Sequence, residues 1–150
     1  MLADNSANFK EMADGNKSIL LVDDDLTLRD MYQERLRAEG FAVDIAKDGE
    51  EALQKAADSL PNIILLDIMM PKINGLDVLK KLREQEKTKN IPVIILTALI
   101  QDREKMESVT RGADDYIVKS ETMPGDVIAK VKRVLEKHSH LGNSILTPGE

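Results

Sequence analysis

Several short apolar stretches of the sequence run directly into a polar side chain that could take part in chemistry. These side chains are three carboxylates, a hydroxyl and an ammonium: Asp23 with Asp24, Asp67, Thr97 and Lys119. A short apolar run bounded by turn signals is typical of a strand that is buried on both faces. Pro71 follows Asp67 by four residues and cannot donate to a strand ladder, so that strand should end near Asp67.

If these strands are parallel, their carboxyl ends share one edge of the sheet and the polar residues converge there. Clustered carboxylates repel each other, and a divalent cation relieves that repulsion. Mg²⁺ prefers oxygen ligands and keeps several waters, so two or three carboxylates suffice to hold it. One shielded carboxylate could then attack a phosphoryl group whose oxygens contact Lys119 and Thr97.

Each of these residues, taken alone, also has an ordinary structural explanation. The acids Asp23 to Asp25 could cap a helix, and Asp67 could be a turn residue. Thr97 could be a turn or cap hydroxyl, and Lys119 a solvated side chain. One cap needs only one carboxylate, so the three consecutive acids and the joint occurrence of all the strand ends favour a site.

The elements that position these residues alternate between strands and helices. Predicted strands cover residues 18–22, 41–46, 62–67, 91–96 and 114–118. Predicted helices cover residues 26–39, 50–60, 76–86, 101–111 and 124–137, and all but the polar 101–111 helix have a clear set of apolar residues facing inward. This alternation indicates an α/β fold, a doubly wound five-stranded parallel sheet with helices on both faces. We expect a mobile N-terminal extension at 1–16, one domain at 17–137 and a C-terminal tail at 138–150.

Composition excludes several classes of protein. The 150 residues carry a net charge of −6, which argues against a general nucleic-acid binder because phosphate contacts need clustered Lys and Arg. The absence of cysteine excludes disulfides and thiolate metal sites. The N-terminus lacks the apolar core of a signal peptide, and no stretch approaches the roughly 20 apolar residues that span a bilayer. We therefore expect a cytoplasmic protein without a membrane or a direct nucleic-acid partner.

At these strand ends the chain resembles the receiver domain of two-component response regulators, with the chemotaxis-type fold. The motifs that carry the resemblance are Leu20-Leu21-Val22-Asp23-Asp24, Leu65-Leu66-Asp67-Ile68-Met69-Met70-Pro71 with Gly75, Leu96-Thr97-Ala98, and Gly112-Ala113-Asp114-Asp115-Tyr116-Ile117-Val118-Lys119. The resemblance covers about residues 17 to 137. It implies a flavodoxin-like sheet with the strand order 2-1-3-4-5.

The resemblance also implies a chemical role for the acidic residues. Asp67 would accept a phosphoryl group from a phosphohistidine of a sensor histidine kinase or a phosphotransfer protein. Asp23, Asp24 and Asp67 would hold Mg²⁺, with Mn²⁺ as an alternative and the backbone carbonyl of Met69 as a further ligand. The chain would be no enzyme beyond catalysing its own phosphorylation and dephosphorylation.

A second set of residues would respond to the phosphoryl group. The resemblance implies that Thr97, Ala98 and Lys119 bind it, and that Thr97 and Tyr116 act as the switch. The switch would repack a surface that binds a downstream protein, built from residues 101–111, 114–118 and 124–137. The implied function is that of a single-domain response regulator in a phosphorelay, and a homodimer is left open.

Two positions depart from the family pattern. Ser120 stands where the family usually has proline after the lysine, and a non-proline cis bond costs roughly 2.5–4 kcal/mol. Met69 and Leu99 lie two residues after Asp67 and Thr97, where related receivers often carry polar residues that guide the hydrolytic water. We therefore hypothesise a comparatively long-lived phosphoryl state.

Two other functions compete with this interpretation. The spacing of Asp23, Asp25 and Thr27 also fits the nucleophile and acid of haloacid-dehalogenase-type phosphatases, with Asp23 as the nucleophile. That family would leave the Asp67 motif unexplained, and it places its acidic pair after the lysine rather than before Lys119. The second alternative is a receiver-like scaffold that never takes a phosphoryl group.

Overall fold

The computed structural model describes residues 17–70, 73–98, 112–119 and 122–146, with side chains described as far as His138. Within these residues five strands form one parallel sheet in the order β2-β1-β3-β4-β5. The strands are β1 (Ser18–Val22), β2 (Ala42–Ala46), β3 (Ile63–Asp67), β4 (Val93–Thr97) and β5 (Asp115–Val118). The predicted doubly wound sheet and its strand order are thereby confirmed.

Four helices lie within the described residues, and the first three begin at side-chain caps. They are α2 (Leu26–Ala38), α3 (Gly49–Ser59), α4 (Gly75–Glu84) and α6 (Pro124–Leu146). The side chains of Asp25, Asp48 and Asn74 accept a backbone N–H three residues on, at 3.1, 2.9 and 3.1 Å, and so cap α2, α3 and α4. The predicted helix at 101–111 and the extension at 1–16 lie outside the described residues.

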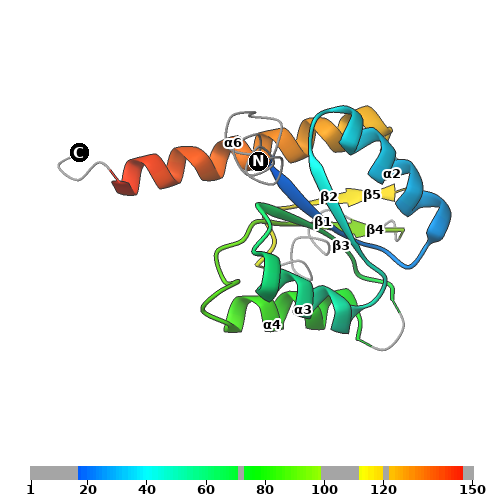
Figure 1. The fold of residues 1–150 in the computed structure, drawn as a ribbon, viewed down its shortest axis with the longest axis horizontal. Coiled ribbons are helices and arrows are strands. Elements are labelled where there is room, and N and C mark those ends of the chain that lie inside the picture. Colours follow the sequence, from blue (N-terminus) through cyan, green and yellow to red (C-terminus); the bar gives the residue numbers. More distant parts are fainter. Residues whose placement is uncertain (1–16, 71–72, 99–111, 120–121, 147–150) are drawn as a thin grey trace, which may run out of the picture.

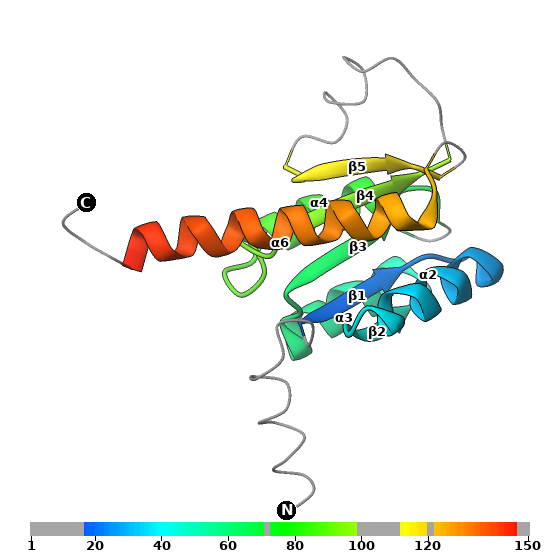
Figure 2. The same ribbon diagram turned by 90° about the horizontal axis from the view of Figure 1, so that it is seen from above.

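The sheet is the middle layer of a three-layer fold, with α2 and α6 on one face and α3 and α4 on the other (Figures 1 and 2). Successive residues of the inner strands point to opposite faces, and both faces are apolar. Ile19, Leu21 and Ile63 pack with the α2 and α6 side, whereas Leu20 and Ile64 pack with the α3 and α4 side. Burial on both faces explains why the strand sequences are continuous apolar runs.

The end of α6 corrects the sequence prediction. The helix was expected to end at residue 137 and to give way to a tail, but it continues to Leu146 and extends past the sheet (Figures 1 and 2). A glycine such as Gly142 costs a helix only about 1 kcal/mol, and the first proline after Pro124 is Pro148. Despite its length, α6 is not apolar enough to cross a bilayer, and the same holds for every other described helix.

Gly75 brings α4 against the end of β3. A Cβ atom at this position would lie 2.3 Å from the backbone oxygen of Asp67 and 2.5 Å from the Cα of Ile68. The Gly75 N–H donates to the Ile68 carbonyl at 3.2 Å. Only glycine permits this approach, so the residue that starts α4 also determines how closely the chain folds back over Asp67.

Candidate functional site

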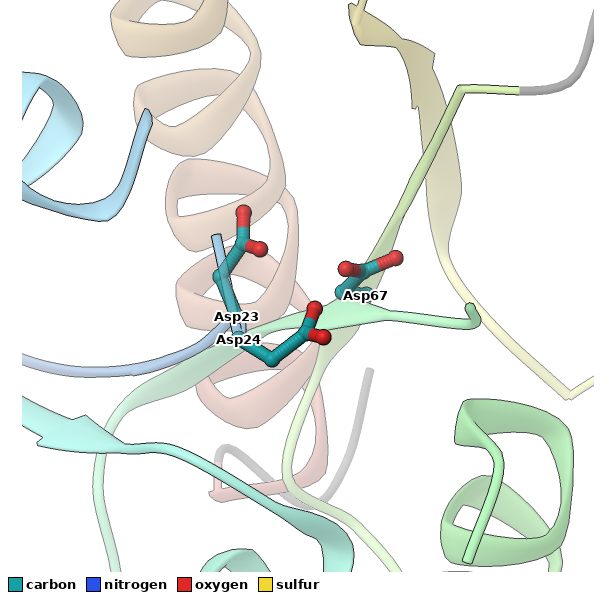
Figure 3. Close-up of side chains that lie close together, drawn as sticks. All are labelled: Asp23, Asp24 and Asp67. Carbon is teal, nitrogen blue, oxygen red and sulfur yellow. The ribbon is translucent and has the colours of Figure 1, made fainter. Parts of the chain in front are cut away.

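The acidic site forms where two neighbouring strands end. Val22 of β1 pairs with Leu66 of β3, so Asp23 and Asp67 lie one step further along adjacent strands. Figure 3 shows the carboxylates of Asp23, Asp24 and Asp67 close together, and one oxygen from each lies within 4.8 Å of the others. Asp23 and Asp67 are 0% and 3% exposed, while Asp24 is exposed and opens the site to solvent.

Backbone amides orient the two buried carboxylates. The N–H of Asp25 donates to Asp23 Oδ1 at 2.9 Å, and the N–H of Met69 donates to Asp67 Oδ1 at 2.9 Å. Each donor lies two residues after its acceptor, which is the geometry of an Asx turn. Arg29, whose role the sequence analysis missed, donates from its guanidinium to the Asp23 carbonyl at 3.2 Å. Both loops are thus held by hydrogen bonds that leave the second carboxylate oxygen, Oδ2, facing the site.

Lys119 supplies the positive charge of the site. Its Nζ lies 2.9 Å from Asp23 Oδ2 and 3.2 Å from Asp67 Oδ2, and its side chain is 9% exposed. Burial alone would lower the pKa of Lys119, but the nearby carboxylates of Asp23 and Asp67 together raise it. The ammonium therefore pairs with two of the three clustered carboxylates, and negative charge remains in excess.

Burial governs the protonation of Asp67. Loss of solvent raises the pKa of Asp67 from 3.8 to about 6, and the charge of Asp23 adds to the increase. The Met69 N–H and the Lys119 ammonium oppose the increase because they favour the charged form. The raised pKa shows that folding forces this carboxylate into surroundings that do not fully stabilise its charge.

The donor set fits a hard divalent cation. Asp23 Oδ2 is buried and, although close to the Lys119 ammonium, it accepts no well-directed hydrogen bond from the described residues. A buried oxygen with unused acceptor capacity is costly unless a ligand supplies a partner. Three carboxylates at this spacing, one of them exposed, offer the oxygen ligands and the solvent access that Mg²⁺ needs.

Thr97, the predicted hydroxyl residue of the site, lies on β4, the strand next to β3. Asp67 pairs with Leu96, so Thr97 at the end of β4 lies one step beyond Asp67, and it is fully buried. Ala98 follows it and is exposed. The predicted residues Asp23, Asp24, Asp67, Thr97, Ala98 and Lys119 therefore all belong to one edge of the sheet. Tyr116 lies further back, opposite Ile95 in the β4–β5 ladder, with Lys130 Nζ 5.6 Å from its ring centroid.

The structure separates the roles of the three consecutive acids. Asp25 caps α2, which is the ordinary structural explanation, whereas Asp23 and Asp24 join Asp67. The carboxylate cluster includes Asp67 and leaves out Asp25, whereas a phosphatase that uses Asp23 would need Asp25 beside it, so the geometry disfavours that alternative. The Lys119–Ser120 bond and Leu99 lie outside the described residues.

Comparison with known proteins agrees with the geometry. The family model described as the response regulator receiver domain matches residues 19–132. The alkaline phosphatase synthesis transcriptional regulatory protein PhoP of Bacillus subtilis is 41% identical over 122 residues, which are 81% of this chain and 50% of that protein. The chain thus spans about half the length of the curated relatives it matches.

Solved structures that are more than 30% identical to this chain share its fold. The Francisella response regulator 1452 receiver domain has a TM-score of 0.74 and 33% identity, covering 81% of this chain and 98% of that one. Response regulator TrrA of Thermotoga maritima, solved in complex with Mg(2+)-BeF, has a TM-score of 0.69 and 38% identity over 79% of this chain and 98% of that one. The matched family model, these relatives and the strand order together show that the chain belongs to the response regulator receiver domain family of two-component signalling.

Proposed function

We propose that Asp67 of this receiver domain accepts a phosphoryl group from a phosphohistidine on a sensor histidine kinase or a phosphotransfer protein. The observation that carries the proposal is the setting of the Asp67 carboxylate. Its Oδ1 accepts the Met69 N–H at 2.9 Å, and its Oδ2 lies 3.2 Å from Lys119 Nζ. Asp67 Oδ1 is therefore held in place, and Oδ2 faces the Lys119 ammonium, which would bind the phosphoryl oxygens.

The transfer exchanges one bond to phosphorus for another. Asp67 Oδ2 attacks, an O–P bond forms, and the P–N bond to the donor imidazole breaks. The electron pair of that bond goes to the imidazole nitrogen, which takes up a proton and leaves as neutral histidine. The Lys119 ammonium and the Thr97 hydroxyl would hold the phosphoryl oxygens, and the small Ala98 leaves them room.

Asp23, Asp24 and Asp67, with the backbone carbonyl of Met69, would hold Mg²⁺, with Mn²⁺ as an alternative. When bound, the metal would offset the repulsion between the carboxylates and an anionic phosphoryl group. The buried Asp23 Oδ2 without a well-directed hydrogen bond supports this assignment, as does the Mg(2+)-BeF complex of TrrA.

The output would be a change of surface rather than a further reaction. Phosphorylation would draw Thr97 toward the phosphoryl group and turn Tyr116 inward, which biases an equilibrium between two packings. The surface affected comprises residues 101–111, β5 and the first part of α6. We propose that the chain acts as a single-domain regulator in the cytoplasm by docking to a downstream protein, and a homodimer stays open.

The test is a labelling experiment. The chain is incubated with acetyl phosphate and Mg²⁺, and the modified residue is mapped by mass spectrometry after reduction of the acyl phosphate. We expect a single label at Asp67 and none in Asp67→Asn. A label at Asp23, or turnover of p-nitrophenyl phosphate, would instead support the phosphatase alternative, and a chain that stays unlabelled would be a scaffold.

A further inference from the structure

The two outer strands of the sheet, β2 and β5, each have one side that no other strand of the described residues covers (Figure 2). Backbone N–H and C=O groups along such a side can pair with a strand of another molecule. We call these two sides the lateral edges, to distinguish them from the ends where the strands begin and finish. At both lateral edges, side chains of the same chain bind the backbone groups that a further strand would use.

The backbone groups of β2 alternate between its neighbour β1 and the lateral edge. The Ala42 N–H donates to the Lys17 carbonyl at 3.0 Å, so the backbone groups of Ala42 face β1. Residues of a parallel ladder bond to opposite sides in turn. The N–H and C=O groups of Val43 and Ile45 therefore face outward, where they are open to an incoming strand unless the chain itself supplies partners.

One pair of opposite charges binds both outward groups of Ile45. The Ile45 N–H donates to Asp44 Oδ1 at 2.8 Å, and the Ile45 carbonyl accepts from Lys55 Nζ of α3 at 2.6 Å. Lys55 Nζ also lies 3.2 Å from Asp44 Oδ1, which joins the acid and the base. The Arg37 guanidinium of α2 donates to the Val43 carbonyl at 3.0 Å. Three outward groups of β2 are thus already bonded by side chains.

The same arrangement recurs at the lateral edge of β5. The Tyr116 N–H donates to Asp115 Oδ1 at 2.7 Å, and the Tyr116 carbonyl accepts from Lys130 Nζ of α6 at 2.9 Å. Lys130 Nζ lies 3.2 Å from Asp115 Oδ1, as in the first pair. The Thr122 hydroxyl donates to the Val118 carbonyl at 2.8 Å, so three backbone groups are again bonded by side chains. We call each unit of aspartate and lysine around one strand residue an edge clamp.

The edge clamps are placed to block a strand rather than to add stability. An exposed ion pair contributes little to folding, and the four charged side chains of the clamps are between 25% and 54% exposed. Each clamp nevertheless sets one negative and one positive charge directly where the backbone of an added strand would lie. Charged side chains at the edge of a sheet are a known protection against pairing between molecules.

We propose that the two edge clamps prevent the lateral edges from pairing with a strand of a second copy of this chain. An added strand must offer an acceptor to the outward N–H and a donor to the outward carbonyl. Each clamp already supplies both, so an added strand would have to displace the aspartate and the lysine and remove water from their charges. Contacts with other proteins are thereby left to side-chain surfaces. This inference is independent of the phosphoryl chemistry proposed for Asp67.

The test compares two double variants of the full chain that lose the same charge. Lys55→Ala with Lys130→Ala opens both clamps, whereas Lys80→Ala with Lys81→Ala removes two exposed lysines of α4. Sedimentation velocity over a range of protein concentrations measures self-association. We expect the clamp variant to associate at a concentration about tenfold or more below that of the wild type, because its outward carbonyls have lost their donors. The α4 variant should behave as the wild type does.

Hydrogen exchange followed by mass spectrometry locates the contact between copies. If strands pair at the lateral edges, backbone hydrogens of β2 and β5 should exchange more slowly in the associated clamp variant than in its dilute form. The single variants Lys55→Ala and Lys130→Ala should show this slowing only in β2 and only in β5, respectively. All measurements are made well below the thermal midpoint of each variant, so that association of unfolded chains does not contribute.

Each outcome either supports the inference or overturns it. Association of the clamp variant with slower exchange in β2 or β5 supports it. A clamp variant that associates no more readily than the wild type would overturn it. Association with unchanged exchange in both strands would also overturn it, since the contact would then lie elsewhere. Equal association of the α4 variant would assign the effect to the loss of positive charge and not to the clamps.

Discussion

The two edges of the sheet, where the strands begin (the amino edge) and where they end (the carboxyl edge), differ in how completely their charges are paired. At the amino edge, the Arg83 guanidinium donates to the carbonyls of Gly112, Ile91 and Lys89 at 2.8, 2.7 and 3.2 Å, and it lies 3.5 Å from Asp114. At the carboxyl edge, three carboxylates lie together, Lys119 pairs with two of them, and a buried oxygen lacks a well-directed hydrogen bond. The amino edge is a structural arrangement that satisfies its own charges. The carboxyl edge leaves an excess of negative charge among the described residues, which is typical of a functional site.

The Asp114 side chain shows how fully the amino edge is paired. Its Oδ2 accepts the Val93 N–H at 2.9 Å, and its Oδ1 lies 2.9 Å from His138 Nε2. One carboxylate thus ties together the start of β4, α4 through Arg83, and α6. We expect variants at this edge to change stability and variants at the carboxyl edge to change chemistry.

The largest expected effect is the loss of labelling in Asp67→Asn. The amide keeps the size of the side chain but cannot form an acyl phosphate, so labelling by acetyl phosphate should be abolished. Quantitative mass spectrometry of the intact chain measures it. Asp114→Asn is the matched control at the other edge and should label at the wild-type rate. Residual label in Asp67→Asn would show that another residue is the acceptor.

The next effect concerns the cation. Asp24→Ala removes one exposed oxygen ligand, and we expect the affinity for Mg²⁺ to fall about tenfold or more. Titration calorimetry with MgCl₂ measures the affinity directly, without any phosphoryl donor. Asp25→Ala, which removes a helix cap beside the site, should weaken α2 but keep Mg²⁺ binding. Equal affinity in Asp24→Ala and wild type would contradict the assigned ligand set.

At the amino edge we expect a loss of stability. Arg83→Ala leaves three carbonyls without their donor and should lower the free energy of unfolding by about 2–3 kcal/mol. Urea unfolding followed by circular dichroism measures the change. Labelling of the folded variant by acetyl phosphate should be unaffected, and a labelling defect would show that the two edges are coupled.

At the carboxyl edge we expect a substitution to raise the free energy of unfolding rather than to lower it. Because the pKa of Asp67 rises from 3.8 in the unfolded chain to about 6 in the fold, its charge destabilises the native state. The stability that protonation of this group provides is complete below pH 4 and is lost as the pH rises through about 6. In metal-free buffer at pH 7, Asp67→Asn should therefore raise the free energy of unfolding by about 1–3 kcal/mol. At pH 4 the gain should vanish, and a gain independent of pH would point to another cause.

The smallest effect concerns the lifetime of the acyl phosphate. Met69 is 55% exposed beside Asp67, and its apolar side chain offers no hydrogen bond to an attacking water. Met69→Asn should therefore shorten the lifetime severalfold, measured as decay of the label after the donor is removed. Met69→Leu is the apolar control and should keep the wild-type lifetime. Equal decay of the wild type and Met69→Asn would refute the hypothesis of a long-lived state.

Sequence reasoning recovered the strands because burial on both faces leaves a strong pattern. Ile63–Leu66 and Ile94–Leu96 are unbroken apolar runs, and each is followed directly by a polar residue of the candidate site, Asp67 or Thr97. Parallel topology then brings Asp23, Asp67, Thr97 and Lys119 to one edge without further information. Among the described elements, strand and helix limits differed from the prediction by only one or two residues, apart from α6.

What the sequence could not show depends on distances across the fold. The pairing of Lys119 with Asp23 crosses from the end of β5 to the end of β1, and local sequence does not determine the reach of a lysine side chain. The exposure of Leu26 depends on which face of α2 meets the sheet. The continuation of α6 past residue 137 is hidden in the sequence because polar residues and a glycine there resemble the end of a helix.

The contact between Lys119 and two carboxylates has a consequence for ion selectivity. An ammonium tethered to the protein acts at an effective concentration far above that of a free ion. Sodium or potassium carries the same single charge and gains nothing by competing with it. An ion of higher charge gains more from the excess of carboxylates, so we expect this edge to bind divalent cations in preference to monovalent ones.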